Sequence, residues 1–216
     1  MTARALGVER GITAAVGSGG KTTLLHRLAR ELSAQGRVIL TTTTHIRPSE
    51  ELPTLLSPSE SELVHALAQS RAVCIGSPAE HGKLRQSELP LSLLTALADF
   101  VLVEADGSRG LPLKAHAAHE PVIPTGCGRV ICVVGASGLN RPIRDAAHRP
   151  ELFCAVTGAQ PQDPATPKRV AALLNAEALG DIYYVNQCEL PGALPAAESL
   201  AASLRKPALC GALRRE

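Results

Sequence analysis

A glycine-rich segment that ends in Gly-Lys-Thr-Thr carries the clearest chemistry in this sequence. Glycines let successive backbone N–H groups turn inward, so such a loop and the start of the following helix surround phosphate oxygens with donors. Lys21 would reach the terminal phosphates of a nucleoside triphosphate, and the Thr22 hydroxyl would bind the Mg²⁺ ion that bridges them. The residues that we expect to hold the nucleotide here are Gly17, Ser18, Gly19, Gly20, Lys21, Thr22 and Thr23.

The loop departs from the full phosphate-binding pattern at one position. That pattern has glycine six residues before the lysine, where this chain has Ala15. The remaining Gly17 and Gly20-Lys21-Thr22 are similar to the shorter loop of Mur-type ligases. The alternative is a glycine-rich turn that joins a strand to a helix and binds no ligand. The flanking sequence favours phosphate binding, because an apolar run at 12–16 predicts a strand and later leucines predict a helix. These leucines are Leu24, Leu25, Leu28 and Leu32.

A second motif, at residues 99–108, is an apolar run that ends in acidic residues. Acids at the end of a strand beside a phosphate-binding loop hold Mg²⁺, usually through a water molecule. The motif aligns with the D-x-x-G of switch-type NTPases, with Glu104 in place of the aspartate and the Gly107 amide facing the γ-phosphate. Asp106 adds a carboxylate, and which acid dominates stays open. The alternative is a strand that ends in a solvated turn.

The run Thr41-Thr42-Thr43-Thr44-His45 follows the second predicted strand. Ligands gather at the carboxyl ends of strands in open α/β sheets, so we expect the hydroxyls of this run, with Thr44 as the main candidate, and the His45 imidazole to border the phosphate site. Threonine is also an ordinary strand residue, so whether any one hydroxyl touches the ligand stays open.

The segment Asn186-Gln187-Cys188-Glu189 follows a late apolar run and resembles the N-K-x-D motif with which GTPases bind guanine. In that motif the carboxylate accepts two hydrogen bonds from the base, and the lysine packs on the ring. Here glutamate replaces aspartate and glutamine replaces lysine. Asn186 and Glu189 are therefore candidates for binding the base, and the choice between ATP and GTP stays open.

Basic residues and histidines follow the acidic motif. Arg109 and Lys114 could neutralise charge that develops on a transferred phosphate, or could be surface charges. The run His116-Ala117-Ala118-His119-Glu120 has residue types that can share a zinc ion. Prolines on both sides disfavour the helix that would align the two histidines. A solvated or phosphate-contacting loop is the favoured interpretation.

These motifs must be positioned by alternating strands and helices. The chain predicts an α/β protein with a three-layer P-loop NTPase-like fold, a mostly parallel sheet flanked by helices, in a single domain at 1–216. Further strands are expected at 38–40, 72–75, 100–103, 130–134 and 182–185, and helices at 91–97, from Thr166-Pro167 and at 194–204. Another helix is expected after Ser57, with Pro58 in its first position, Glu60 in a capping box and Leu63, Val64 and Leu67 buried.

Composition narrows the functional classes. A formal net charge of +2 and only two Tyr and two Phe do not favour nucleic-acid binding. The six cysteines form no C-x-x-C pair, which is typical of reduced thiols in the cytosol. No charged-then-apolar leader precedes the glycine loop, and no apolar run approaches the ~20 residues of a membrane span. We therefore expect a soluble cytoplasmic protein that binds neither nucleic acid nor membranes.

Taken together, these motifs resemble one family. The resemblance extends from Gly17 to Glu189 and rests on the glycine loop, Thr-Thr-Thr-Thr-His-Ile, Val-Glu-Ala-Asp-Gly-Ser-Arg-Gly-Leu-Pro-Leu-Lys-Ala, His-Glu-Pro-Val-Ile-Pro and His-Arg-Pro-Glu-Leu. The family is YqeC, described as accessory proteins of selenium-dependent molybdenum hydroxylases. The resemblance implies a P-loop NTPase fold and a role in maturing a molybdenum enzyme or its cofactor. The chain departs from the family at the Asn186 motif and at His116, where the family often has proline.

Two classes of function follow. The first is a Mg²⁺-dependent NTPase, or a small-molecule kinase or Mur-like ATP-dependent ligase. In it Lys21 stabilises phosphoryl charge, Thr22 with Glu104 or Asp106 holds the metal, and Arg109 or Lys114 assists. The second is a nucleotide-gated binding protein that docks a client molybdenum hydroxylase or carries its cofactor. A homodimer is compatible with both, since many P-loop proteins complete their sites across subunits.

Overall fold

The computed structural model describes residues 2–213. These residues form two compact units, each assembled from separate stretches of the chain. The first unit contains the residues up to Ala15, Thr22–Gly107 and Val122–Arg129. The second contains Val16–Lys21, Ser108–Pro121 and the residues from Val130 onward. The single domain expected from the sequence stays a prediction.

The first unit is built on a parallel sheet. Its main strands lie in the spatial order β1 (Gly11–Gly17), β7 (Phe100–Glu104), β2 (Val38–Thr42) and β5 (Ala72–Pro78). Ala15 of β1 and Thr42 of β2 both stand opposite Glu104 of β7, so the carboxyl ends of these strands are level. Three short strands continue the unit: β4 (Thr54–Leu56) parallel to β5, β6 (Leu84–Arg85) antiparallel to β5, and β3 (His45–Ile46) antiparallel to β6.

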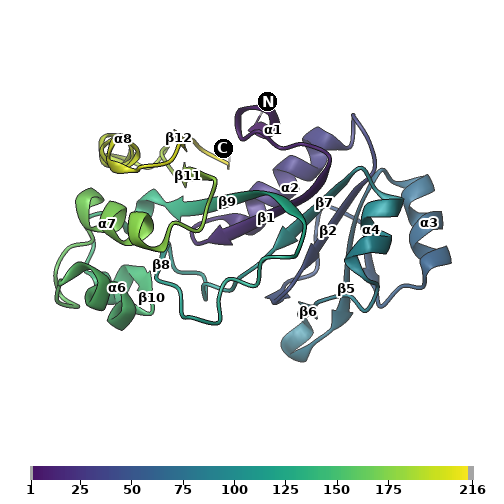
Figure 1. Cartoon of the computed structure of the whole chain (residues 1–216), viewed down its shortest axis with the longest axis horizontal. Helices are drawn as coiled ribbons and strands as arrows, with labels where there is room; N and C mark the ends of the chain where they lie inside the picture. Colours follow the sequence, from purple (N-terminus) through teal and green to yellow (C-terminus); the bar gives the residue numbers. More distant parts are fainter. Residues whose placement is uncertain (1, 214–216) are drawn as a thin grey trace. The chain divides into compact units, whose positions relative to one another are not determined.

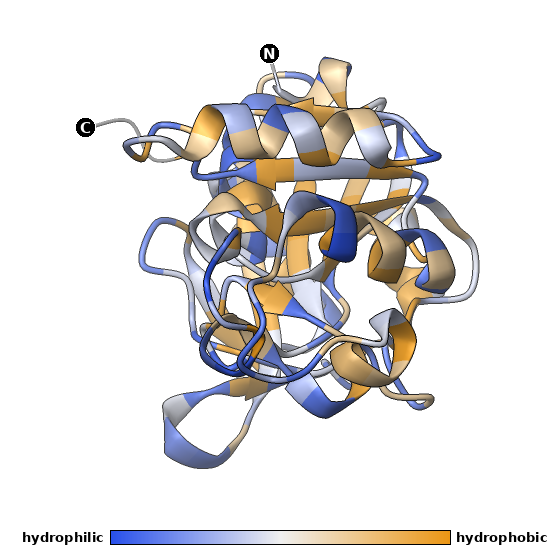
Figure 2. Cartoon of the chain, turned by 90° about the vertical axis from the view of Figure 1, so that its left-hand side faces the viewer, coloured by the Kyte–Doolittle hydropathy of each residue, from blue (hydrophilic) through white to orange (hydrophobic). Residues whose placement is uncertain are grey.

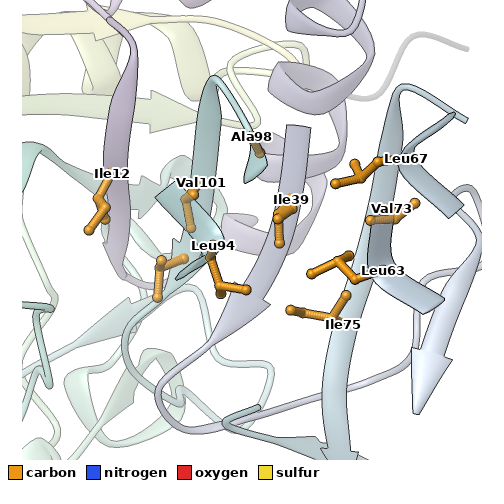
Figure 3. Packing of buried hydrophobic residues seen from close by; sticks show 10 residues of the cluster. Ile12, Ile39, Leu63, Leu67, Val73, Ile75, Leu94, Ala98 and Val101 are labelled. Atoms are coloured by element: carbon orange, nitrogen blue, oxygen red, sulfur yellow. The ribbon is translucent and has the colours of Figure 1, made fainter. Parts of the chain in front are cut away.

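Helices cover both faces of this sheet. Helices α3 (Glu60–Gln69) and α4 (Leu91–Leu97) pack on one face, and Figure 3 shows their leucines directed at the strand residues of the same cluster. Side chains alternate along a strand, so Glu104 points to the other face. Helix α2 (Lys21–Leu32) lies there, because its Thr22 contacts the Glu104 carboxylate. The unit also contains α1 (Thr2–Ala5) and the 3₁₀ turn η1 (Glu80–Gly82).

The start of α3 differs from the prediction. Ser59, not Ser57, is the N-cap, and its capping-box partner is Glu62, not Glu60. The sequence contains two overlapping capping-box patterns, Ser57 with Glu60 and Ser59 with Glu62. The prediction of the first was wrong, because Ser57 has a left-handed backbone (φ 45°) and Pro58 precedes the helix. Val64 was also wrongly expected to be buried: it is 45% exposed, whereas Leu63 and Leu67 are buried.

The second unit has its own parallel strands, in the order β9 (Cys127–Gly135), β11 (Ile182–Asn186) and β12 (Ala208–Cys210). A separate two-stranded parallel sheet joins β8 (Leu113–Lys114) to β10 (Ala147–His148). The remaining elements are η2 (Ala136–Gly138), α5 (Ile143–Ala146), α6 (Pro150–Thr157), α7 (Pro167–Glu177) and α8 (Ala193–Ser203). Helices α6 and α7 lie side by side (Figure 1).

Burial explains why these segments form the predicted elements. Figure 2 shows the strands largely in the orange of apolar residues. Thr166 caps α7 by accepting a hydrogen bond from the Arg169 backbone, and Val170, Leu173 and Leu174 are buried as expected. The predicted α/β fold, with mostly parallel strands flanked by helices, is confirmed. Within residues 2–213, no helix has both the length and the apolar character needed to cross a bilayer.

Candidate functional site

The glycine loop follows β1 and ends where α2 begins, at Lys21. Gly17, Gly19 and Gly20 all have positive φ, at 86°, 85° and 128°. These positions also have no room for a side chain. A Cβ atom at Gly19 would collide with the backbone of Gly135, and a Cβ atom at Gly20 would collide with the side chain of Asn186. Only glycine combines these backbone angles with such close approach.

The Lys21 side chain folds back over this loop. Lys21 is only 4% exposed, and its ammonium group donates a hydrogen bond to the Gly17 carbonyl oxygen at 2.7 Å. The Ser108 hydroxyl lies 3.5 Å from the same nitrogen. The structure thus places the lysine charge next to the loop and next to the segment that follows the acidic motif.

Other residues of the second unit anchor the loop. The Ser18 backbone N–H donates to the Val133 carbonyl at 2.8 Å, and the Ser18 hydroxyl donates to the Leu111 carbonyl. Asn186, at the end of β11, donates its amide to the Gly19 carbonyl at 2.8 Å. The side-chain oxygen Oδ1 of Asn186 accepts a hydrogen bond from the Leu213 backbone N–H at 3.1 Å, so both ends of this side-chain amide are hydrogen-bonded.

The rest of the proposed base motif lies beyond Asn186. Gln187 has a left-handed backbone (φ 68°), and its side-chain oxygen Oε1 accepts a hydrogen bond from the Ser137 hydroxyl at 2.7 Å. Glu189 is exposed in the following turn. Asn186 therefore contacts the glycine loop, whereas Glu189 is accessible to solvent.

In the first unit, a hydroxyl and a carboxylate meet at the start of α2. Thr22 Oγ1 donates to Glu104 Oε2 at 2.7 Å, and Glu104 is only 8% exposed. Asp106 follows two residues later and is fully buried. Hydroxyl and carboxylate oxygens are the hard ligands that Mg²⁺ prefers, so this donor set fits the predicted metal.

The threonine run borders this carboxylate through its backbone. Thr42 Oγ1 donates to the Glu104 carbonyl at 2.8 Å and accepts the Thr44 N–H at 2.9 Å. The Thr44 hydroxyl lies 3.5 Å from that of Thr42. His45 is exposed on β3, while Thr23 and Gly107 are partly buried. Thr42, at the end of β2, is one of the hydroxyls expected from the sequence to border the phosphate site, and that role stays a prediction.

Two charged groups of the second unit meet at one carboxylate. Lys114 Nζ lies 2.8 Å from Glu120 Oε2, and Arg149 donates to the same oxygen. Burial alone would raise the pKa of Glu120, but hydrogen bonds from Arg149 and Lys114, together with their charges, lower it to about 2. Lys114 is therefore buried and ion-paired, whereas Arg109 is exposed with a left-handed backbone (φ 51°).

Comparison with known proteins identifies the family. The family model described as "YqeC protein" matches residues 13–151, which is more than half of the chain. The chain belongs to the YqeC family. The matched range covers the glycine loop, the acidic motif and Arg149 of this YqeC chain, and ends before Asn186.

A curated relative supports the same assignment. The "Uncharacterized protein YqeC" of Escherichia coli (strain K12) is 39% identical over 159 residues. The alignment covers 69% of this chain and 62% of the relative, so the chain spans less than two thirds of that protein's length. Among solved structures, the hydrogenase maturation factor HypB from Archaeoglobus fulgidus is similar, with 14% identity and a TM-score of 0.44 over 98% of this chain and 84% of that one. A likeness this distant gives no ground for a functional conclusion.

The histidine run of this YqeC chain does not gather ligands for zinc. His116 Nδ1 lies 2.8 Å from Glu177 Oε2, and its backbone N–H donates to Glu177 Oε1 at 2.7 Å. His119 is exposed. Among residues 2–213, no three His, Cys, Asp or Glu side chains gather closely enough to hold a metal ion on their own.

Proposed function

We propose that this YqeC-family protein binds a nucleoside triphosphate with Mg²⁺ and cleaves it at the γ-phosphate, as an accessory factor in the maturation of a molybdenum hydroxylase or its cofactor. One observation carries the proposal: Thr22, at the start of the loop helix, is 2.7 Å from the buried carboxylate of Glu104. Lys21, which immediately precedes Thr22, has its ammonium group over the glycine loop. A strand, a glycine loop, a lysine and a metal-binding hydroxyl in this order form a triphosphate-binding device.

The roles of the residues follow from their positions. The loop N–H groups and the Lys21 ammonium would bind the phosphate oxygens, and the ammonium would exchange the Gly17 carbonyl for an anionic partner. Asn186 would keep the loop open for the phosphates by holding the Gly19 carbonyl. The Gly107 amide and Thr44 would lie at the phosphate end of the site, as the sequence predicts.

The Mg²⁺ ion would be held by Thr22 and Glu104, with Asp106 as a further carboxylate. When bound, the metal neutralises charge on the β- and γ-phosphates. In hydrolysis, a water oxygen forms a bond to the γ-phosphorus, the bond from that phosphorus to the bridging oxygen breaks, and the products are the diphosphate, inorganic phosphate and a proton. With a kinase-like acceptor, an acceptor oxygen takes the place of water.

The accessory role rests on the family resemblance and not on the geometry. Nothing in the loop or the carboxylate pair specifies a molybdenum enzyme as the client. If nucleotide binds but is not turned over with any acceptor, the better description is a nucleotide-gated binding protein.

Isothermal titration with Mg²⁺ and non-hydrolysable ATP and GTP analogues tests the proposal. We expect binding to the unaltered chain, and loss of at least about tenfold in affinity for Lys21→Ala, because the lysine makes charge-assisted bonds to phosphate. Lys168→Ala, at an exposed lysine on α7, is the matched control and should bind normally. Equal affinity of the Lys21 variant and the control would disprove the assignment of the loop. Tighter binding of the GTP analogue would support Glu189 as a ligand of the guanine base. Tighter binding of the ATP analogue would argue against that role.

A further inference from the structure

The small sheet of β8 and β10 brings basic side chains together from distant parts of the sequence. The two strands are parallel, and Lys114 stands directly opposite His148. The Ala115 N–H donates to the His148 carbonyl at 3.0 Å, which fixes this register. Residues paired across neighbouring strands point to the same face of a sheet. Lys114 and His148 therefore share one face.

Glu120 holds two of the basic groups at fixed positions. Its carboxylate pairs with Lys114, whose side chain is entirely buried, and with Arg149, whose side chain is 20% exposed. Arg149 directly follows His148 and is the N-cap of α6, where its backbone is left-handed (φ 61°). A guanidinium has five N–H donors in a planar fork, so it can serve a carboxylate and a second anion together.

Positively charged side chains act on His148. Burial lowers the pKa of His148, and the charges of Arg149, Lys114 and Arg109 lower it further, against a smaller opposite effect of Glu120. His148 is partly exposed, so its side chain is accessible from solvent. A neutral imidazole with a ring N–H is also a hydrogen-bond donor for an oxyanion.

The segment at residues 108–114 contains two members of this cluster and also contacts Lys21. Ser108, 3.5 Å from Lys21 Nζ, directly precedes Arg109. Leu111 accepts the hydroxyl of Ser18, and Lys114 lines the same small hollow as Gly17 and Ser18. All of these residues belong to the second unit. Lys114 of the basic cluster thus lies beside Gly17 and Ser18 of the glycine loop, and Arg109 is one residue away from a contact of Lys21.

We propose that Arg109, His148 and Arg149 bind a phosphate group on a second substrate of the triphosphate-cleaving reaction, with Lys114 and Glu120 as positioning residues. Calling the ligand a second substrate rests on the proposed function; the anion site itself does not. The exposed Arg109 supplies a side chain that can close on the ligand, and Arg149 supplies a rigid one. Arginine suits this task because its planar fork matches the oxygens of a phosphate.

The test is an NMR titration of the His148 ring with inorganic phosphate at constant pH, assigned by the resonance lost in His148→Asn. The unaltered full chain and Lys21→Ala are compared, because the second variant impairs the glycine loop. We expect a saturable shift of the His148 resonance in both, with the dissociation constant raised at least about tenfold by Arg109→Ala. Arg205→Ala, another exposed arginine of the second unit, is the control and should change nothing.

Each outcome separates this inference from the proposed function. A shift that requires an intact Lys21 would place phosphate in the glycine loop alone and overturn the second site. A non-saturable drift, equal for the Arg109 and Arg205 variants, would mean charge screening and would also overturn it. If the nucleotide analogues fail to bind but phosphate still saturates the His148 shift, the proposed function is wrong and the anion site stands.

Discussion

At the scale of single residues, the decisive contact is between Thr22 and Glu104. Each residue type was expected from the sequence, because both lie in motifs with a fixed spacing. Their 2.7 Å hydrogen bond depends on β1 and β7 being neighbours, with Ala15 opposite Glu104. Asn186 was expected from its motif as a base ligand, which stays a prediction, and the structure adds a contact that the motif did not indicate: its side-chain amide donates to the Gly19 carbonyl oxygen.

Substitution of Thr22 should weaken nucleotide binding only when the metal is present. Thr22→Ala removes the hydroxyl that would bind Mg²⁺, so we expect affinity for a triphosphate analogue to fall at least about tenfold with Mg²⁺. Without Mg²⁺ the variant and the unaltered chain should bind alike. Titration calorimetry with and without the metal measures this, and Thr22→Ser should restore binding. An equal loss in both conditions would contradict a role in metal binding.

The glycine loop makes a second prediction at this scale. Gly19→Ala should destabilise the fold by about 1–3 kcal/mol, because the residue has positive φ and its Cβ would meet the Gly135 backbone. Gly126→Ala separates the two causes, since Gly126 also has positive φ (79°) but open space around the added atom. Urea unfolding measures both. Equal losses would show that the close approach of the loop to Gly135 costs nothing.

At the scale of elements, long apolar patterns were sufficient and short elements were not. The strands β1, β2, β7 and β11 were expected because each contains a largely apolar run. The two-residue strands β8 and β10 have no pattern of their own, and their pairing joins residues far apart in the sequence. The basic cluster around Glu120 was therefore predictable only in its residue types.

Helix α3 gives a prediction that distinguishes two overlapping capping signals. Ser59→Ala should lower the free energy of unfolding by about 1 kcal/mol, because Ser59 accepts the Glu62 N–H and the Glu62 carboxylate accepts the Ser59 N–H. Ser57→Ala should change little, since Ser57 lies outside the helix. Urea unfolding curves of the two variants suffice. A larger loss for Ser57→Ala would restore the helix start that the sequence first suggested.

At the scale of the whole molecule, chain order and spatial grouping differ. Each compact unit contains stretches from several parts of the sequence, and one of the points at which the chain passes from one unit to the other lies between Lys21 and Thr22. Local sequence patterns carry no information about such grouping, because it depends on which distant strands pair. Motif spacing nevertheless predicts candidate site residues, since the glycine loop and the acidic motif each extend over only a few residues.

The ion pairs of Glu120 should make stability depend on pH in acid. The folded-state pKa of Glu120, about 2, lies below its usual value of 4.5, so the folded state binds this proton less readily than the unfolded chain. The stabilisation is complete above about pH 4.5 and is lost as the pH falls toward 2. At pH 6, Glu120→Gln should lower the free energy of unfolding by about 2 kcal/mol, because buried Lys114 loses a charged partner.

Urea unfolding at a series of pH values measures this effect. The free energies of unfolding of Glu120→Gln and of the unaltered chain should converge as the pH is lowered from 5 toward 3. Glu9→Gln, at an exposed glutamate, should follow the unaltered chain throughout. A constant gap between Glu120→Gln and the unaltered chain over this range would show that the cost of the substitution does not come from the lost carboxylate charge.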